Sequence, residues 1–145
     1  MIDRDEIVAA LIAAAGGTLI GRVRLQKTLY LLEQLGLRSE MPFEYHHYGP
    51  YSRGLYNATA DAKALGSVRE DFEHRHSDGA MYSIFRLADE ASVKDEAYGP
   101  LGRDRSAEYV RLFAATNVTV LELAATVDWL WRTEGVRDWL SEVTK

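Results

Sequence analysis

Apolar residues recur at helical spacing in three parts of the first 66 residues. Each of these runs is closed by glycine, which commonly ends a helix. The predicted helices cover residues 3–15, 22–35 and 52–65. Asp3 and Glu6 predict a capping box at the first start, and Ser52 is the expected N-cap of the third helix. Between the second and third helices, residues 43–48 predict a short extended stretch that enters a turn at Gly49-Pro50.

The pattern changes from helical to alternating between residues 68 and 87. Asp78-Gly79 in the middle of this segment is typical of a two-residue β-hairpin turn. With that turn, Phe72 lies opposite Phe85 and Asp71 opposite Arg86, which gives one apolar and one oppositely charged cross-strand pair. We therefore predict a hairpin in this register.

The last third of the chain predicts a loop and then helices. Residues 88–105 are acidic and typical of a solvated loop, with a short helix around residues 91–97 as the alternative. Helices are expected at 106–115, 120–132 and 136–143. Thr119 and Glu122 predict a capping box before the second of these helices. That helix is apolar around most of its circumference, so it should be buried on several sides.

This order of elements predicts a mainly α fold with a small β-hairpin, of the α+β class. Three helices followed by a hairpin are the parts of a winged helix. We expect one domain, with a winged-helix-like core at residues 1–87, an acidic loop at 88–105 and a C-terminal helical extension at 106–145.

Composition narrows the class of protein. The 145 residues contain no Cys, which excludes disulfides and thiolate chemistry, and a chain of this size can build a core without either. No apolar run is long enough to span a bilayer and the first residues are too acidic for a signal peptide, so we expect a cytoplasmic protein without a membrane partner. The net charge of -5 argues against a protein that coats nucleic acid.

The negative charge is unevenly distributed. Residues 1–66 carry equal numbers of acidic and basic side chains, so the net charge of -5 comes entirely from residues 67–145. An acidic hairpin fits poorly against phosphates. One local basic face is still predicted, and the candidate nucleic-acid contacts are Arg22, Arg24, Lys27, Ser52, Arg53, Tyr56 and Asn57.

Aromatic residues indicate a second kind of surface. Tyrosine and tryptophan suit either the edge of a core or an interface with another protein. The candidate residues for a protein partner or a homodimer are Tyr48, Tyr51, Trp129, Trp131 and Trp139. Packing within the chain is the alternative for the same residues.

Metal and catalytic chemistry find little support in the sequence. His74 and His76 share one face of a strand, but no third ligand is fixed nearby, and His46 and His47 should point to opposite sides. Phosphate-binding glycine loops, nucleophile elbows and zinc-protease motifs are absent from the sequence. We therefore predict no metal, no cofactor and no enzymatic activity.

Two motifs carry a family resemblance. Residues 24–32, Arg-Leu-Gln-Lys-Thr-Leu-Tyr-Leu-Leu, followed by Tyr-Gly-Pro-Tyr-Ser at 48–52, resemble the YwgA-like bacterial proteins. A more distant similarity is to Panacea-domain proteins, which include SocA-like antitoxins, although Tyr51-Ser52 departs from the residues typical of that group. The resemblance implies a small cytoplasmic winged-helix-like protein, and its Panacea part implies direct binding of a toxin.

The sequence thus supports two hypotheses of function. The first is a non-enzymatic, regulatory or antitoxin-like protein that acts through contacts with a toxin-like partner or a second copy of itself. The alternative is a sequence-specific DNA-binding transcriptional regulator that uses helix 51–65 and the basic start of the preceding helix.

Overall fold

The computed structural model describes residues 2–47, 49–88 and 92–133 of the chain. Its elements, in chain order, are α1 (Arg4–Ala14), β1 (Thr18–Ile20), α2 (Arg22–Gln34), β2 (Glu44–His46), β3 (Gly49–Tyr51), α3 (Arg53–Ala64), β4 (Val68–His74), β5 (Met81–Leu87), the 3-10 helix η1 (Asp95–Leu101), α4 (Arg103–Ala114) and α5 (Val118–Thr133). The predicted α+β class is confirmed. The more specific winged-helix description stays a prediction, and the predicted helix at 136–143 lies outside the described residues.

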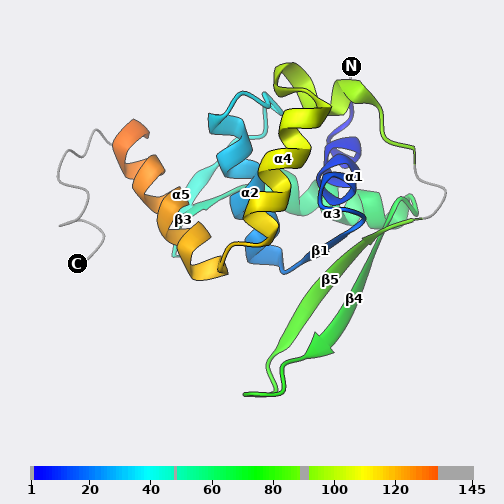
Figure 1. Ribbon diagram of the computed structural model, residues 1–145, viewed down its shortest axis with the longest axis vertical. Helices are drawn as coiled ribbons and strands as arrows, with labels where there is room; N and C mark the ends of the chain where they lie inside the picture. The colour runs from blue at the N-terminus through cyan, green and yellow to red at the C-terminus, as the bar shows by residue number, and fades with distance from the viewer. Residues whose placement is uncertain (1, 48, 89–91, 134–145) are drawn as a thin grey trace.

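Two small antiparallel sheets join the helices. Strands β1, β5 and β4 form one sheet in that order, and β2 pairs with β3 in the other. The β4–β5 hairpin extends away from the helices, as Figure 1 shows. Strand β1 was not predicted because three residues are too few to establish an alternating pattern. Its Leu19 is buried in the core, and its pairing with residues 84–86 depends on tertiary structure.

The predicted hairpin register is wrong by two residues. Phe72 lies opposite Ser83, and Asp71 lies opposite Ile84. The loop is longer than a two-residue turn, because backbone hydrogen bonds join Arg75 to Gly79 and Ala80 and the Asp78 carboxylate accepts from the Ala80 N–H. A shift of two residues keeps each side chain on the same face. Arg86 Nε therefore still reaches Asp71 Oδ2, at 3.0 Å.

Helix α1 lies at the centre of the hydrophobic core. Every residue from Ile7 to Ile12 is buried, and α1 packs against α3, α4, β5 and η1. The predicted capping box of Asp3 and Glu6 is confirmed. Ser52 likewise caps α3 as predicted, because its Oγ accepts from the Leu55 N–H at 3.1 Å.

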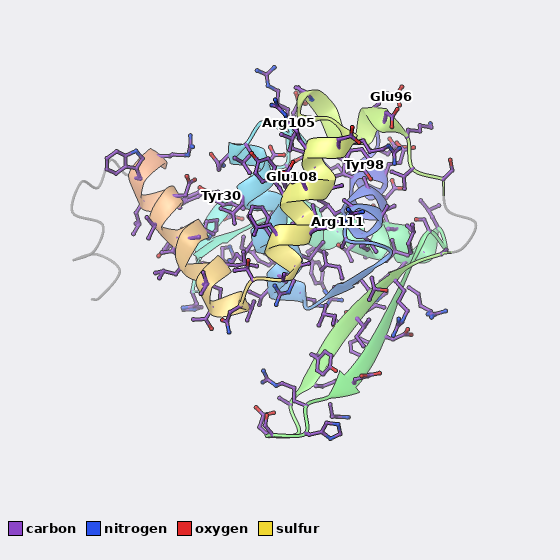
Figure 2. The ribbon with its side chains drawn as sticks, in the orientation of Figure 1. Tyr30, Glu96, Tyr98, Arg105, Glu108 and Arg111 are labelled. Atoms are coloured by element: carbon purple, nitrogen blue, oxygen red, sulfur yellow. The ribbon has the colours of Figure 1, made fainter. Side chains whose placement is uncertain are left out.

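The segment predicted as an acidic loop contains a buried helix. In η1, Tyr98 is only 2% exposed and its hydroxyl donates to the Ala10 carbonyl at 2.9 Å. Figure 2 shows Tyr98 beside α1. The sequence did not predict this core contact, because the acidic residues around Tyr98 indicated a solvated loop. Helix α4 also begins earlier than predicted, at Arg103.

The N-terminus of α5 differs from the prediction as well. Asn117 Oδ1 accepts from the Thr119 N–H at 2.8 Å, so Asn117 acts as the cap and Thr119 lies inside the helix. The predicted capping box of Thr119 and Glu122 is therefore wrong. None of the helices in the described ranges has the length and apolar character required to cross a lipid bilayer.

Candidate functional site

The two sequence motifs that resemble a known family contact each other in space. The Gln26 side chain donates to the Ser52 carbonyl at 2.9 Å and accepts from the Ser52 N–H at 2.8 Å. Lys27 Nζ donates to the Pro50 carbonyl at 2.7 Å. Helix α2 therefore holds both β3 and the start of α3. Gly49-Pro50, which was predicted as a turn, lies instead in strand β3 because it pairs with β2, and the Pro50 carbonyl receives the Lys27 hydrogen bond.

Lys27 brings a titratable amine into the interior. The residue is 3% exposed, and this burial lowers the pKa of its amine to about 8, although the Glu122 carboxylate acts in the opposite direction. A buried cation is costly unless it is hydrogen-bonded or paired. Its bond to Pro50 meets part of that need and places the amine at the wall of a cavity.

This cavity, which we call the aromatic pocket, lies between α2, α3, β5 and the β2–β3 sheet. Its volume is about 360 Å³, which is within the usual range for ligand sites. The wall contains three aromatic rings and two imidazoles beside the amine of Lys27. The lining residues are Arg22, Val23, Leu25, Gln26, Lys27, His46, His47, Gly49, Tyr51, Tyr56, Thr59 and Phe85.

Arg22 is held at the edge of the aromatic pocket by both charge and rings. Its guanidinium lies 5.4 Å from the centroid of Tyr56 and 5.8 Å from that of Phe85. It also donates two hydrogen bonds to Glu70, at 2.8 and 2.6 Å. A fork of two bonds fixes both the position and the plane of a guanidinium.

Glu70 is the fully buried carboxylate behind this arrangement. Its side chain accepts from Arg22, Lys63 and Ser83. Burial acts to raise the pKa of Glu70, but these three hydrogen bonds hold it at about 2. Sequence reasoning treated Glu70 as part of an acidic hairpin. Its burial could have been predicted from its alternation with Val68, because residues two apart in a strand lie on the same face.

The predicted basic face is largely engaged inside the protein. Arg22 pairs with Glu70, and Lys27 is buried beneath Pro50. Arg24 donates to the carbonyls of Phe113 and Thr116, at 2.7 and 2.5 Å, and so joins α2 to the end of α4. These three side chains do not form the predicted basic face, because strands β3 and β4 and the end of helix α4 supply their partners.

The α3 candidates have a different environment. Ser52 is buried and caps the helix, whereas Arg53, Tyr56 and Asn57 are exposed. Tyr56 faces both the solvent and the aromatic pocket. Reading of DNA bases by this helix stays a prediction.

The candidate partner residues separate into two environments. Trp129 is half-buried, with its ring 6.2 Å from Tyr30 and 6.1 Å from Tyr45, so it packs within the chain. Trp131 is 59% exposed. Tyr51 lines the aromatic pocket and stacks near His46, with ring centroids 4.8 Å apart. Tyr48 and Trp139 lie outside the described residues.

Helix α5 is buried on one side only, which corrects the expectation of burial on several sides. Leu121 and Ala125 are buried, while Val120, Leu123 and Trp131 are 54%, 47% and 59% exposed. Positions 120, 123 and 131 lie on one side of a helix. Helix α5 lies at the left side of the molecule in Figure 1, where it packs against α2 and β3.

The four histidines do not come together as metal ligands. His46 and His47 line the aromatic pocket, and His74 and His76 are exposed near the end of the hairpin. Across the described part of the chain, no group of three histidines or carboxylates is placed to hold a metal ion.

Comparison with known proteins identifies a curated relative. The chain is similar to a DNA ADP-ribosyl glycohydrolase from Thermus aquaticus, with 32% identity over 127 residues. The match covers 86% of this chain but 34% of the relative, so the chain spans about a third of that protein's length. No protein-family model matches the chain. The resemblance to YwgA-like and Panacea-domain proteins stays a prediction.

This similarity corrects the prediction that the chain is not an enzyme. The relative is named as an enzyme, and this finding overturns the expectation of a non-enzymatic protein. Known catalytic motifs mark only some hydrolase sites, so their absence from the sequence does not exclude catalysis. The aromatic pocket is built from α2, α3, β5 and the β2–β3 sheet, so no single stretch of sequence identifies it.

Proposed function

We propose that this chain takes part in the hydrolysis of ADP-ribosyl groups from DNA. In this proposal the aromatic pocket receives the nucleotide part of the substrate. The observation that carries the proposal is a cavity of about 360 Å³ that combines aromatic rings with an arginine and a buried lysine. The similarity to a DNA ADP-ribosyl glycohydrolase supports the reaction class.

The pocket offers suitable contacts for each part of an ADP-ribosyl group. The rings of Tyr51 and Tyr56 provide faces on which adenine can stack. Arg22 is oriented in advance by Glu70, and Lys27 adds a second cation for the pyrophosphate. Charged donors bind phosphate oxygens more strongly than neutral donors do.

Hydrolysis of a glycosidic bond also requires proton transfer. Imidazole is the side chain that most often transfers protons in enzymes. His46 and His47 line the aromatic pocket and are our candidates for this role. They would protonate the leaving group or activate the attacking water.

Tyr56→Ala is expected to weaken ADP-ribose binding by about tenfold. Stacking of a base on an aromatic ring contributes about 1–3 kcal/mol, and Tyr56 is half exposed, so its loss should leave the core intact. Calorimetric titration of ADP-ribose into the full chain measures this effect. Phe72→Ala is the control, because Phe72 is a comparably exposed ring on β4 and is not among the residues of the pocket.

The reaction itself is tested with an ADP-ribosylated oligodeoxynucleotide. Release of ADP-ribose is followed by mass spectrometry for the wild type and for a variant with both His46→Ala and His47→Ala. We expect the double variant to lose release while retaining ADP-ribose binding. A wild-type chain that neither binds ADP-ribose nor releases it would refute the proposal.

A second function, binding of a protein partner, is favoured by the apolar face of α5. Exposed groups of large apolar side chains commonly mark interaction sites, and tryptophan is over-represented among the residues that dominate binding energy. The partner is a toxin-like protein, as the predicted resemblance implies, or a second copy of this chain. This function is compatible with a hydrolase activity.

Leu123→Glu is expected to weaken such an association by at least about tenfold, because it places a charge within the apolar face of α5. Sedimentation velocity of the purified chain measures self-association. Titration with the product of the neighbouring reading frame measures binding of a different partner. Leu65→Glu is the matched control at an exposed leucine outside α5. Equal association of both variants in both measurements would contradict this function.

A further inference from the structure

A second cavity lies at the base of the β4–β5 hairpin, beside the ends of α1 and α3. Its volume is about 820 Å³, and three of its lining side chains are cations, namely Lys63, Arg69 and Arg86. The remaining wall contains Gly16, Gly17 and Gly66, which have no side chains to fill the space beside the cations. We call this cavity the basal pocket. It shares none of the lining residues of the aromatic pocket.

Arg69 and Arg86 lie directly opposite each other across β4 and β5. Like charges in directly opposed positions destabilise a pair of strands. Both guanidiniums use their Nε to donate to the same oxygen of Asp71, at 3.1 and 3.0 Å. A single carboxylate therefore serves two arginines.

Most of the hydrogen-bonding capacity of these arginines is unused. A guanidinium has five N–H donors, and each arginine spends one of them on Asp71. The other four on each have no partner among the described residues. The side chain of Arg69 is 69% exposed and that of Arg86 is 39% exposed, so both are accessible to a ligand.

The local charge has the opposite sign to the charge of the whole protein. Two cations, from Arg69 and Arg86, share the single carboxylate of Asp71, which leaves a charge of +1 on this face of β4. Lys63 also lines the basal pocket, and its charge is balanced by Glu70, which lies on the other face of β4. The whole chain, by contrast, has a net charge of -5. An additional anion would reduce the repulsion between Arg69 and Arg86 and use their remaining donors.

We propose that the basal pocket binds a phosphate-bearing anion through Arg69 and Arg86, with Lys63 at its side. Arginine pairs suit phosphate because their planar forks match its oxygens. The phosphate comes either from a DNA backbone or from a free pyrophosphate group, and both have the same chemistry. This inference rests on the two opposed arginines that share one carboxylate, and it is independent of the proposed function.

Binding is tested with inorganic pyrophosphate and with a short fluorescent single-stranded oligodeoxynucleotide, each at low salt. The variant with both Arg69→Gln and Arg86→Gln is expected to bind pyrophosphate at least about tenfold more weakly, because two charge-assisted contacts are lost. Arg105→Gln is the matched control on the exposed side of α4 and should bind as the wild type does (Figure 2).

Asp71→Asn provides a test in the opposite direction. It removes the carboxylate that competes for both guanidiniums, so pyrophosphate binding should tighten severalfold. Arg69→Gln alone changes an exposed side chain, so it should fold even if the double variant does not. It should also bind pyrophosphate more weakly than the wild type does. Thermal unfolding of each variant checks the fold.

The two ligands distinguish the source of the phosphate. Oligonucleotide binding that falls with the same variants and is displaced by pyrophosphate supports a DNA backbone. Pyrophosphate binding without oligonucleotide binding supports a free pyrophosphate group. Failure of the wild type to bind either ligand, or unchanged binding by the folded arginine variants, would overturn the proposal.

Discussion

Gly49→Ala is expected to lower the free energy of unfolding by about 4 kcal/mol. Gly49 has a φ of +95°, a conformation that side chains with a Cβ rarely adopt. A Cβ at this position would also lie 2.6 Å from Thr126 Oγ1 on α5, which is far too close. The change would therefore push α5 away from β3 and distort the wall of the aromatic pocket that Gly49 lines.

Two further variants separate backbone strain from the clash. Gly17 has a φ of +97° and open space around its Cβ position, so Gly17→Ala should cost only the strain, about 2 kcal/mol. Adding Thr126→Ala to Gly49→Ala should remove the clash and leave only the strain. The double variant should then lose about 2 kcal/mol of the free energy of unfolding, as Gly17→Ala does. Chemical denaturation measures the free energies, and amide hydrogen exchange in α5 reports its displacement. If Thr126→Ala gives no recovery, the close approach of α5 does not limit Gly49.

Glu70→Gln is expected to lower the free energy of unfolding by about 3 kcal/mol at pH 7. Glu70 is the buried carboxylate on which Arg22, Lys63 and Ser83 converge, and an amide cannot form the two ion pairs. Arg22 should then lose its fixed orientation at the aromatic pocket. Equilibrium denaturation measures the change.

The same carboxylate predicts how stability depends on pH. The pKa of Glu70 is about 2 in the folded protein, against an ordinary value of 4.5. Because the folded value is depressed, the stabilisation is fully present above about pH 4.5 and is lost as the pH falls towards 2. Glu70→Gln should lack this loss. Glu73→Gln, at an exposed position on the same strand, is the control and should retain it. Identical acid profiles for both variants would contradict this account.

These two residues link stability to the candidate site. Gly49 allows α5 to approach strand β3, which Lys27 holds, and Glu70 holds Arg22 at the opposite side of the pocket. Neither residue supplies a ligand contact in the proposed function. Their predicted effects on ADP-ribose binding therefore act through the shape of the pocket and the position of Arg22.

Local sequence patterns predict three helices and two hairpin strands within the first 87 residues, but they do not predict strands β1 and β3. Asp3 with Glu6 and Ser52 marked two helix starts, and both caps are present because capping depends on neighbours within three residues. The hairpin strands were also predicted, since alternation is a local pattern. The same reasoning fails for Tyr98, whose partner Ala10 lies 88 residues away along the chain.

Which polar residues share a site depends on how distant segments of the chain pack together. Gln26 and Lys27 could be assigned to a helix, but their bonds to residues 50 and 52 depend on how two segments pack. Arg22 was predicted as a free cation, and Glu70 as part of a solvated hairpin. Folding pairs them, because burying either charge without an opposite charge would cost more than the pair does. Local spacing thus determined the elements, while long-range packing and desolvation determined the pocket.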